Sequence, residues 1–235
     1  MLDKKAKMNI ETREITKVYA INRGHKNLCY AVKGVNIHIS AGEIVGLLGN
    51  SGSGKTTIGM ILAGLLKPTS GSILYNGQMI TYPYKGDLRK NIQILFQHPE
   101  ISFNPMLPII KSMNEPYNLY NPPFTKEKLL RDLKRVGLYE EHLNRYPSEM
   151  SGGQLQRLAL IRLLVLRPSL IILDEPTSML DVISQAQIIN MLKEYQYETN
   201  CAFLLISHNR ELVRAVCNKI YVIEKGIVSK SKVFE

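Results

Sequence analysis

The sequence predicts an α/β fold in which a mixed sheet carries an antiparallel β edge and a helical insert. Three observations predict it. A glycine-rich loop lies between a short apolar segment and a helical one near residue 50. Strand-like and helix-like segments alternate from Leu170 onward. Between these two parts the composition changes, first to a stretch rich in proline and asparagine and then to helical patterns.

The glycine-rich loop fits the pattern G-x-x-x-x-G-K-[ST], the P-loop that binds nucleotide phosphates. Its glycines let the backbone turn tightly, so that N–H groups and the following helix N-terminus face phosphate. We expect Lys55 to contact the outer phosphates and the Thr56 hydroxyl to bind Mg²⁺. A chance glycine turn is the alternative, expected in about one chain of this length in a hundred. The residues predicted to bind nucleotide here are Gly49, Asn50, Ser51, Gly52, Ser53, Gly54, Lys55, Thr56 and Thr57.

Short strands surround this loop, because apolar residues alternate or form runs bounded by turn residues. Asn76-Gly77 is a hairpin signal. The predicted strands are residues 10–18, 31–40, 43–48, 72–75 and 91–96, with a polar loop over 22–27 and a helix over 58–66.

The middle of the chain is predicted to be mostly helical. Residues 98–124 contain too many prolines for a strand, Thr125 caps a helix that Gly137 ends, and Ser151 caps a helix that is almost entirely apolar. Strands over 170–173, 202–206 and 219–223 then alternate with helices over 182–199 and 211–217. We therefore expect a single nucleotide-binding domain over 1–235, with a P-loop core at about 1–97 and 168–235 and a helical subdomain at about 98–167.

The composition is that of a globular protein with a sizeable core. A net charge of +10 favours an anionic partner such as nucleotide, nucleic acid or a membrane surface, but the charge is spread along the chain. No apolar run approaches a membrane span, and the first residues lack the apolar region of a signal peptide. The three cysteines lack metal-site spacing, so we expect buried, reduced thiols.

Two carboxylates end the apolar segment 170–173. Asp174 is suited to hold Mg²⁺, and Glu175 to orient and deprotonate an attacking water. A surface acidic pair is the alternative. His208 and Gln97 also follow strands, and each of them alone could be an ordinary loop residue.

A second phosphate-binding helix start is predicted after Met150, where a serine cap is followed by two glycines. One chain rarely needs two such sites for one nucleotide, which suggests a composite site built from two subunits. A plain helix cap is the alternative. The residues concerned are Ser151, Gly152, Gly153 and Gln154.

These motifs, in this order over nearly the whole chain, resemble the nucleotide-binding subunit of an ATP-binding cassette (ABC) transporter. The resemblance implies that Tyr19 stacks on adenine and that Gln97 touches Mg²⁺ and couples to the membrane subunit. It implies that Ser151-Gly152-Gly153-Gln154 contacts the partner subunit's ATP. It also implies that Asp181 links the two sites and that His208 senses the γ-phosphate.

Within that family, residues 96–99, 102–105 and 181–185 resemble the branch that imports peptides and nickel. Met150, His98 and Asn209 depart from the usual residues, and a chain ending at Glu235 lacks the longer tail of many members. The effect of these departures stays open. Peptide and nickel, or a nickel-carrying metallophore, both remain possible cargoes, with a slight preference for nickel.

The sequence therefore predicts an ATP-hydrolysing subunit of an importer, bound to the cytoplasmic face of the cell membrane, with ATP and Mg²⁺ as cofactors. Glu175 is the expected base, and Lys55 and the loop amides stabilise transition-state charge. The expected partners are two permease subunits, a second and different ATP-binding subunit and an extracytoplasmic substrate-binding protein, with no nucleic acid. The alternatives are an exporter ATPase, a nucleic-acid-associated ABC ATPase and an interaction module with a dead site. The last conflicts with the presence of Lys55, Asp174 and Glu175.

Overall fold

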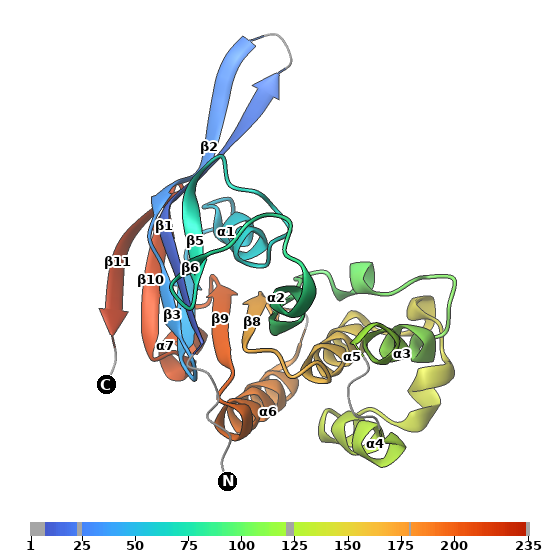
Figure 1. Cartoon of the computed structure of the whole chain (residues 1–235). Helices are drawn as coiled ribbons and strands as arrows, with labels where there is room; N and C mark the ends of the chain where they lie inside the picture. The colour runs from blue at the N-terminus through green and yellow to red at the C-terminus, as the bar shows by residue number, and fades with distance from the viewer. Residues whose placement is uncertain (1–7, 23–24, 121–124, 179, 234–235) are drawn as a thin grey trace.

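The computed structural model describes residues 8–22, 25–120, 125–178 and 180–233. Two sheets lie side by side, and a group of helices extends from one side of the larger sheet (Figure 1). The division into a core and a helical subdomain stays a prediction.

The larger sheet has the strand order β11-β10-β4-β9-β8-β7, and all of its pairs are parallel except β10–β11. Its central strands are runs of apolar residues because both faces of the sheet are covered. The strands are β4 (Ile44–Leu48), β7 (Ile92–Leu95), β8 (Leu170–Asp174), β9 (Ala202–Ser207), β10 (Lys219–Glu224) and β11 (Ile227–Val233).

The smaller sheet is antiparallel, with the order β2-β1-β5-β6 and with β3 paired to β1. The β5–β6 hairpin turns at Asn76 and Gly77, whose φ angles of 52° and 79° are those that a tight hairpin turn requires. The strands are β1 (Asn9–Asn22), β2 (His25–Val35), β3 (His38–Ser40), β5 (Ser70–Tyr75) and β6 (Gln78–Met79).

Helix α1 lies between the two sheets and packs against β7, β8, β9 and β2, whereas the other long helices lie on the opposite face of the larger sheet. This gives one apolar core on each face of that sheet. The helices are α1 (Lys55–Leu62), α2 (Gly86–Asn91), α3 (Ile109–Tyr120), α4 (Lys126–Arg135), α5 (Gly152–Leu164), α6 (Val182–Thr199) and α7 (Arg210–Val216), with 3₁₀ turns η1 (Pro99–Ser102), η2 (Glu140–Asn144) and η3 (Pro147–Glu149).

Local signals at the helix ends are confirmed. Thr125 Oγ1 accepts a hydrogen bond of 3.3 Å from the Lys128 backbone N–H, and Gly137 follows α4 with φ 69°. The predicted bounds of α6 agree with the structure. No helix among the described residues is long and apolar enough to span a membrane.

Several boundaries were predicted wrongly. The polar loop over 22–27 is shorter than expected, because β2 already begins at His25; residues 23 and 24 lie outside the described residues. The segment 31–40 is interrupted between β2 and β3. Helix α1 begins at Lys55 rather than at 58, and it ends at Leu62 rather than at 66 because Gly64, with φ 73°, cannot continue it. Helices α2 and α3 and strand β11 were not predicted. Cys201 and Cys217 are buried as expected, but Cys29 is exposed.

Gly46 in β4 lets α7 approach the sheet closely. A Cβ atom on Gly46 would lie 2.5 Å from Val213 Cγ1 and 3.1 Å from Cys217 Sγ. We expect Gly46→Ala to lower the free energy of unfolding by about 1–3 kcal/mol, because the stiff Val213 side chain must shift. Urea unfolding would measure this loss. In a Val213→Ala background the loss should shrink, and an equal loss in both backgrounds would contradict the steric explanation.

Candidate functional site

The P-loop connects the end of β4 to the start of α1, and only glycine fits at two of its positions. Gly54 has φ 104°, and a Cβ atom there would lie 2.2 Å from the Ala31 carbonyl oxygen. A Cβ atom on Gly49 would lie 2.4 Å from the Ile223 carbonyl oxygen. The loop backbone therefore lies directly on β2 and β10, which fixes its curve.

Lys55 is almost buried, with 7% of its surface exposed, and its ammonium group lies within the loop. The Lys55 Nζ donates to the carbonyl oxygens of Gly49 (2.8 Å) and Asn50 (2.9 Å). The Ser53 hydroxyl is also buried and lacks a hydrogen-bond partner among the described residues. This arrangement concentrates positive charge and hydrogen-bond donors where the motif would hold phosphate.

Asp174, at the end of β8, is 2% exposed, and its Oδ1 atom has no hydrogen-bond partner in the described part of the chain. Burial raises the pKa of Asp174, and the negative charge of Glu175 adds to this. A hydrogen bond from Thr56 and the charge of Lys55 act in the opposite direction. A buried carboxylate oxygen without a donor, beside a threonine hydroxyl, is a donor set that suits Mg²⁺.

Glu175 and His208 are brought into contact. His208 donates its backbone N–H to Glu175 Oε1 (3.1 Å), and its Nδ1 atom lies 2.8 Å from the same oxygen. Ser207 Oγ donates to Glu175 Oε2 at 3.3 Å. Only 10% of the Glu175 side chain is exposed, against 64% for His208. The carboxylate is therefore buried and held by hydrogen bonds, whereas the imidazole faces solvent.

The backbone of Glu175 is in the left-handed region, with φ 50°. Its N–H donates to the Ile206 carbonyl oxygen at 3.0 Å, and its own carbonyl oxygen accepts from Ser178 Oγ (3.1 Å) and Gln156 Nε2 (3.4 Å). A non-glycine residue adopts this conformation only where its surroundings hold it there. The strand-end carboxylate is thus fixed in direction.

Tyr19 and Gln97 are placed at the surface, without a described contact to the Asp174–His208 cluster. Tyr19 lies on β1, is 40% exposed, and has Lys17 Nζ 5.4 Å from its ring centroid. Gln97 is exposed and follows β7, which is the neighbour of β8 in the sheet. Both side chains are accessible to a ligand.

The helix predicted to start at Ser151 is confirmed, and its start is a capping box; phosphate binding there stays a prediction. Ser151 Oγ accepts from the Gln154 N–H (3.2 Å), and Gln154 Oε1 accepts from the Ser151 N–H (2.9 Å). Helix α5 lies with the other helices on one side of the larger sheet, whereas α1 lies between the sheets (Figure 1).

Sequence reasoning missed the contacts made by the polar residues of α5. Gln156 is 1% exposed and reaches the Glu175 carbonyl oxygen. Arg157 Nη1 donates to Ser184 Oγ (3.1 Å), which donates to Asp181 Oδ2 (2.8 Å). The only available signal was the presence of polar side chains on an otherwise apolar helix.

Arg162, five residues after Arg157 on α5, contacts the 3₁₀ turn that follows β7. Its Nη1 donates to the Ser102 carbonyl oxygen (2.6 Å), and its guanidinium carbon lies 4.9 Å from the Phe103 ring centroid. Glu115 on α3 lies 3.5 Å away. The arginine therefore joins α5 to both α3 and residues 102–103.

The unusual residues at three positions have structural partners. Asn209 caps α7, since its Oδ1 accepts from the N–H groups of Glu211 (3.0 Å) and Leu212 (3.1 Å). His98 Nδ1 lies 3.2 Å from Glu100 Oε1, and Met150 is buried in the core under α5. None of the three disturbs the local fold.

Comparison with known proteins agrees with this geometry. The model of the ABC transporter family matches residues 32–178. The oligopeptide transport ATP-binding protein AppF of Bacillus subtilis is 40% identical over 228 residues, which cover 92% of this chain and 69% of that protein. The di/tripeptide transport ATP-binding protein DppF of Pseudomonas aeruginosa is 37% identical over 228 residues, or 92% of this chain and 70% of that protein.

Among solved structures, a dimeric ATP-binding cassette in a post-hydrolysis state, bound to ADP and Pi, is 29% identical, with a TM-score of 0.84. The match covers 95% of this chain and 98% of that one. The chain therefore belongs to the ABC transporter family. Its fold is that of the family's ATP-binding cassette, and the chain is an ATPase.

The buried charge of Asp174 leads to a stability prediction. Asp174→Asn should raise the free energy of unfolding by about 1 kcal/mol at pH 7, because it removes a carboxylate charge that burial disfavours. Since the folded-state pKa is raised, this penalty exists above that pKa and disappears as the pH falls through it. Urea unfolding of both proteins from neutral to acidic pH should show the advantage of the variant vanishing in acid. A variant that is less stable at pH 7 would contradict this account.

Proposed function

We propose that the chain is the ATP-hydrolysing subunit of an ABC importer for peptides. The observation that carries the hydrolytic part is the buried Glu175 carboxylate, bonded to His208 and Ser207 at the sheet edge that also bears the P-loop. A carboxylate fixed there is suited to orient and deprotonate a water beside the γ-phosphate. His208, largely exposed, is suited to contact that phosphate.

The remaining roles follow from the chemistry of each group. Loop amides from Gly49 to Thr57 and the Lys55 ammonium bind the ATP phosphates and stabilise transition-state charge. Thr56, Asp174 and Gln97 would hold Mg²⁺, which neutralises charge on the phosphates when it is bound. The exposed Tyr19 ring would stack on adenine.

We further propose that two copies of this fold sandwich ATP, with Ser151-Gly152-Gly153-Gln154 of one subunit facing the nucleotide of the other. Support comes from the capping box, which leaves the glycine backbone at the start of α5 in a fixed orientation, and from the dimeric cassette that the fold resembles. In the assembly we expect a second, different ATP-binding subunit, two permease subunits and an extracytoplasmic substrate-binding protein. The chain would lie on the cytoplasmic face of the membrane.

The cargo proposal rests on the relatives. Those compared above carry peptide transport names, which favours peptides over the nickel that the sequence slightly preferred. Ile101, Met106 and Leu107, close in sequence to residues 102–103 that Arg162 contacts, are exposed apolar side chains that a permease could cover. The names of these relatives support neither the exporter nor the nucleic-acid alternative, and the net charge of +10 is spread along the chain.

Glu175→Gln tests the catalytic proposal. The amide keeps the side-chain size but cannot accept a proton, so steady ATP turnover should fall at least about 100-fold. ATP binding, measured by equilibrium dialysis, should persist. Glu211→Gln, an exposed position on α7, is the control and should retain normal turnover. Near-normal turnover of Glu175→Gln would remove Glu175 from this role.

The importer proposal is tested by ATP turnover of the subunit assembled with its co-encoded membrane partners in lipid vesicles. Adding peptide-loaded binding protein should stimulate turnover, and nickel-loaded binding protein should not. If only the nickel-loaded binding protein stimulated turnover, the cargo would be nickel rather than peptide. If the rate of ATP turnover did not change with the membrane partners but rose when DNA or RNA was added, the nucleic-acid alternative would be supported instead.

A further inference from the structure

Gln156 is a polar side chain that is buried in an otherwise apolar part of α5. It is 1% exposed, and its neighbours Leu155 and Leu158 are buried as well. Its Oε1 atom has no hydrogen-bond partner among the described residues, and its Nε2 atom donates over a distance of 3.4 Å. Burying a polar group costs free energy unless it is well hydrogen-bonded. An apolar side chain of the same size should be at least as stable here, so stability does not explain the glutamine.

The hydrogen bond that Gln156 makes ends on the backbone of Glu175. The Glu175 carbonyl oxygen accepts from Gln156 Nε2 (3.4 Å), from Ser178 Oγ (3.1 Å) and from the Ser178 backbone N–H (3.3 Å). Ser178 belongs to the loop that connects β8 to α6, whereas Gln156 belongs to a different helix. Gln156 therefore ties the backbone at Glu175 to α5.

The backbone at Glu175 sets the direction of its carboxylate. Its φ angle of 50° lies in the left-handed region, where a non-glycine residue stays only if its surroundings hold it. The Glu175 N–H is held by Ile206, and the carboxylate by Ser207 and His208, all of them in or directly after β9. The carbonyl oxygen is the part that α5 holds. Its release would let the backbone leave this region and turn the carboxylate with it.

A second contact ties the other end of the same loop to α5. Arg157, next to Gln156, donates from Nη1 to Ser184 Oγ (3.1 Å), and Ser184 Oγ donates to Asp181 Oδ2 (2.8 Å). Asp181 immediately precedes α6. Both ends of the loop between β8 and α6 are therefore expected to follow the position of α5.

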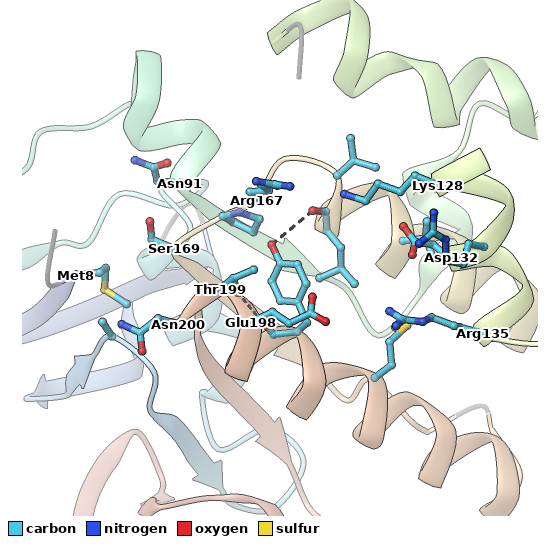
Figure 2. Close-up of a pocket in the computed structure, with 18 of the residues that line it drawn as sticks. Met8, Asn91, Lys128, Asp132, Arg135, Arg167, Ser169, Glu198, Thr199 and Asn200 are labelled. Carbon is cyan, nitrogen blue, oxygen red and sulfur yellow. Dashed lines mark hydrogen bonds between the residues drawn. The ribbon is translucent and has the colours of Figure 1, made fainter. Parts of the chain in front are cut away.

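Helix α5 has room to shift at its far end. Ile161, Leu164 and Val165 line a cavity of about 810 Å³ between α4, the end of α6 and the residues before β8 (Figure 2). A helix beside such a cavity lacks the close packing contacts that would fix it on that side. The apolar face of α5 still packs in the core, so the cavity allows a small displacement rather than release of the helix.

We propose that Gln156 is a positioning residue for the Glu175 carboxylate, through which the place of α5 controls the rate of ATP hydrolysis. The inference rests on the proposed function, in which Glu175 is the base and the start of α5 faces the nucleotide of the second subunit. Nucleotide bound there would fix α5, and Gln156 would then hold Glu175 in the direction that accepts the proton of the attacking water. ATP at one site would thus prepare the other site for hydrolysis.

Gln156→Met is the test, because methionine keeps the length and approximate volume of glutamine and removes both polar atoms. Steady ATP turnover is measured under the conditions used for Glu175→Gln and is expressed per bound ATP, so that any unfolded protein does not count. The kcat value should fall at least about tenfold, since a small misplacement of a catalytic group is costly. The dissociation constant for ATP should not change, and the urea midpoint of unfolding should be equal or higher. Gln156→Leu should behave in the same way.

Three further variants separate positioning from other effects. Leu160→Met is the matched control and should retain normal turnover, because Leu160 lies one turn further along α5, is equally buried and cannot donate to Glu175. Ser178→Ala removes a donor to the same carbonyl oxygen but leaves the tie to α5, so its loss of turnover should be smaller. The double variant Gln156→Met and Glu175→Gln should be as slow as Glu175→Gln alone, because Gln156 acts through Glu175.

Normal turnover in Gln156→Met and Gln156→Leu, with Glu175→Gln inactive, would overturn the proposal. A lower urea midpoint with unchanged turnover would also do so, because a purely structural role predicts that result. An equal or larger loss in Ser178→Ala would exclude the dependence on α5, and a double variant slower than Glu175→Gln would show that Gln156 acts elsewhere. Normal turnover of Glu175→Gln itself would instead contradict the proposed function, so the two failures are distinguishable.

Discussion

The parallel pairing of β4, β9, β8 and β7 is the constraint on which the whole site depends. The carboxyl ends of parallel strands meet at one edge, so the loops after these strands emerge together. Asp174 is paired with Ile206 in this sheet, and that register brings Glu175 to His208. A slip of one residue would turn every side chain of the strand to the other face. The apolar residues that fix the register are therefore as necessary to the site as its carboxylates.

Helix α5 joins the parts of the site that the sheet does not hold. Its polar side chains reach three different segments: Gln156 the backbone of Glu175, Arg157 the Asp181 carboxylate through a serine hydroxyl, and Arg162 the turn after β7. Buried polar groups are costly unless they are hydrogen-bonded, so these contacts specify one position of the helix. Since α5 begins at the predicted ATP-facing cap, a displacement of its start would be transmitted to both the carboxylate strand and the surface turn.

The parts of the fold that could be predicted are those set by neighbouring residues. The Thr125 and Ser151 caps, the strands of the larger sheet and the P-loop all have local signals. The contact between Glu175 and His208, 33 residues apart, could not be predicted because it depends on strand order. Helix α3 was missed because Pro116 lies within it, and a proline normally interrupts a helix. The burial of Ile109 and Met113 on the same helix offsets the hydrogen bond that the proline cannot make. Strand β11 and helix α2 are short or exposed, and their patterns are weak.

Two features of the site lower the stability of the fold, and both belong to its carboxylates. Asp174 is buried with an oxygen that lacks a donor among the described residues, and Glu175 is held at a φ angle that costs about 1–3 kcal/mol. A nucleotide and metal that bind only the folded state would offset these costs, by about 2.7 kcal/mol at one hundred times the dissociation constant. Until then the two apolar cores, one on each face of the larger sheet, must hold the carboxylates in place. The buried charge of Asp174, which Thr56 and Lys55 offset only in part, would attract the Mg²⁺ that we propose for this site.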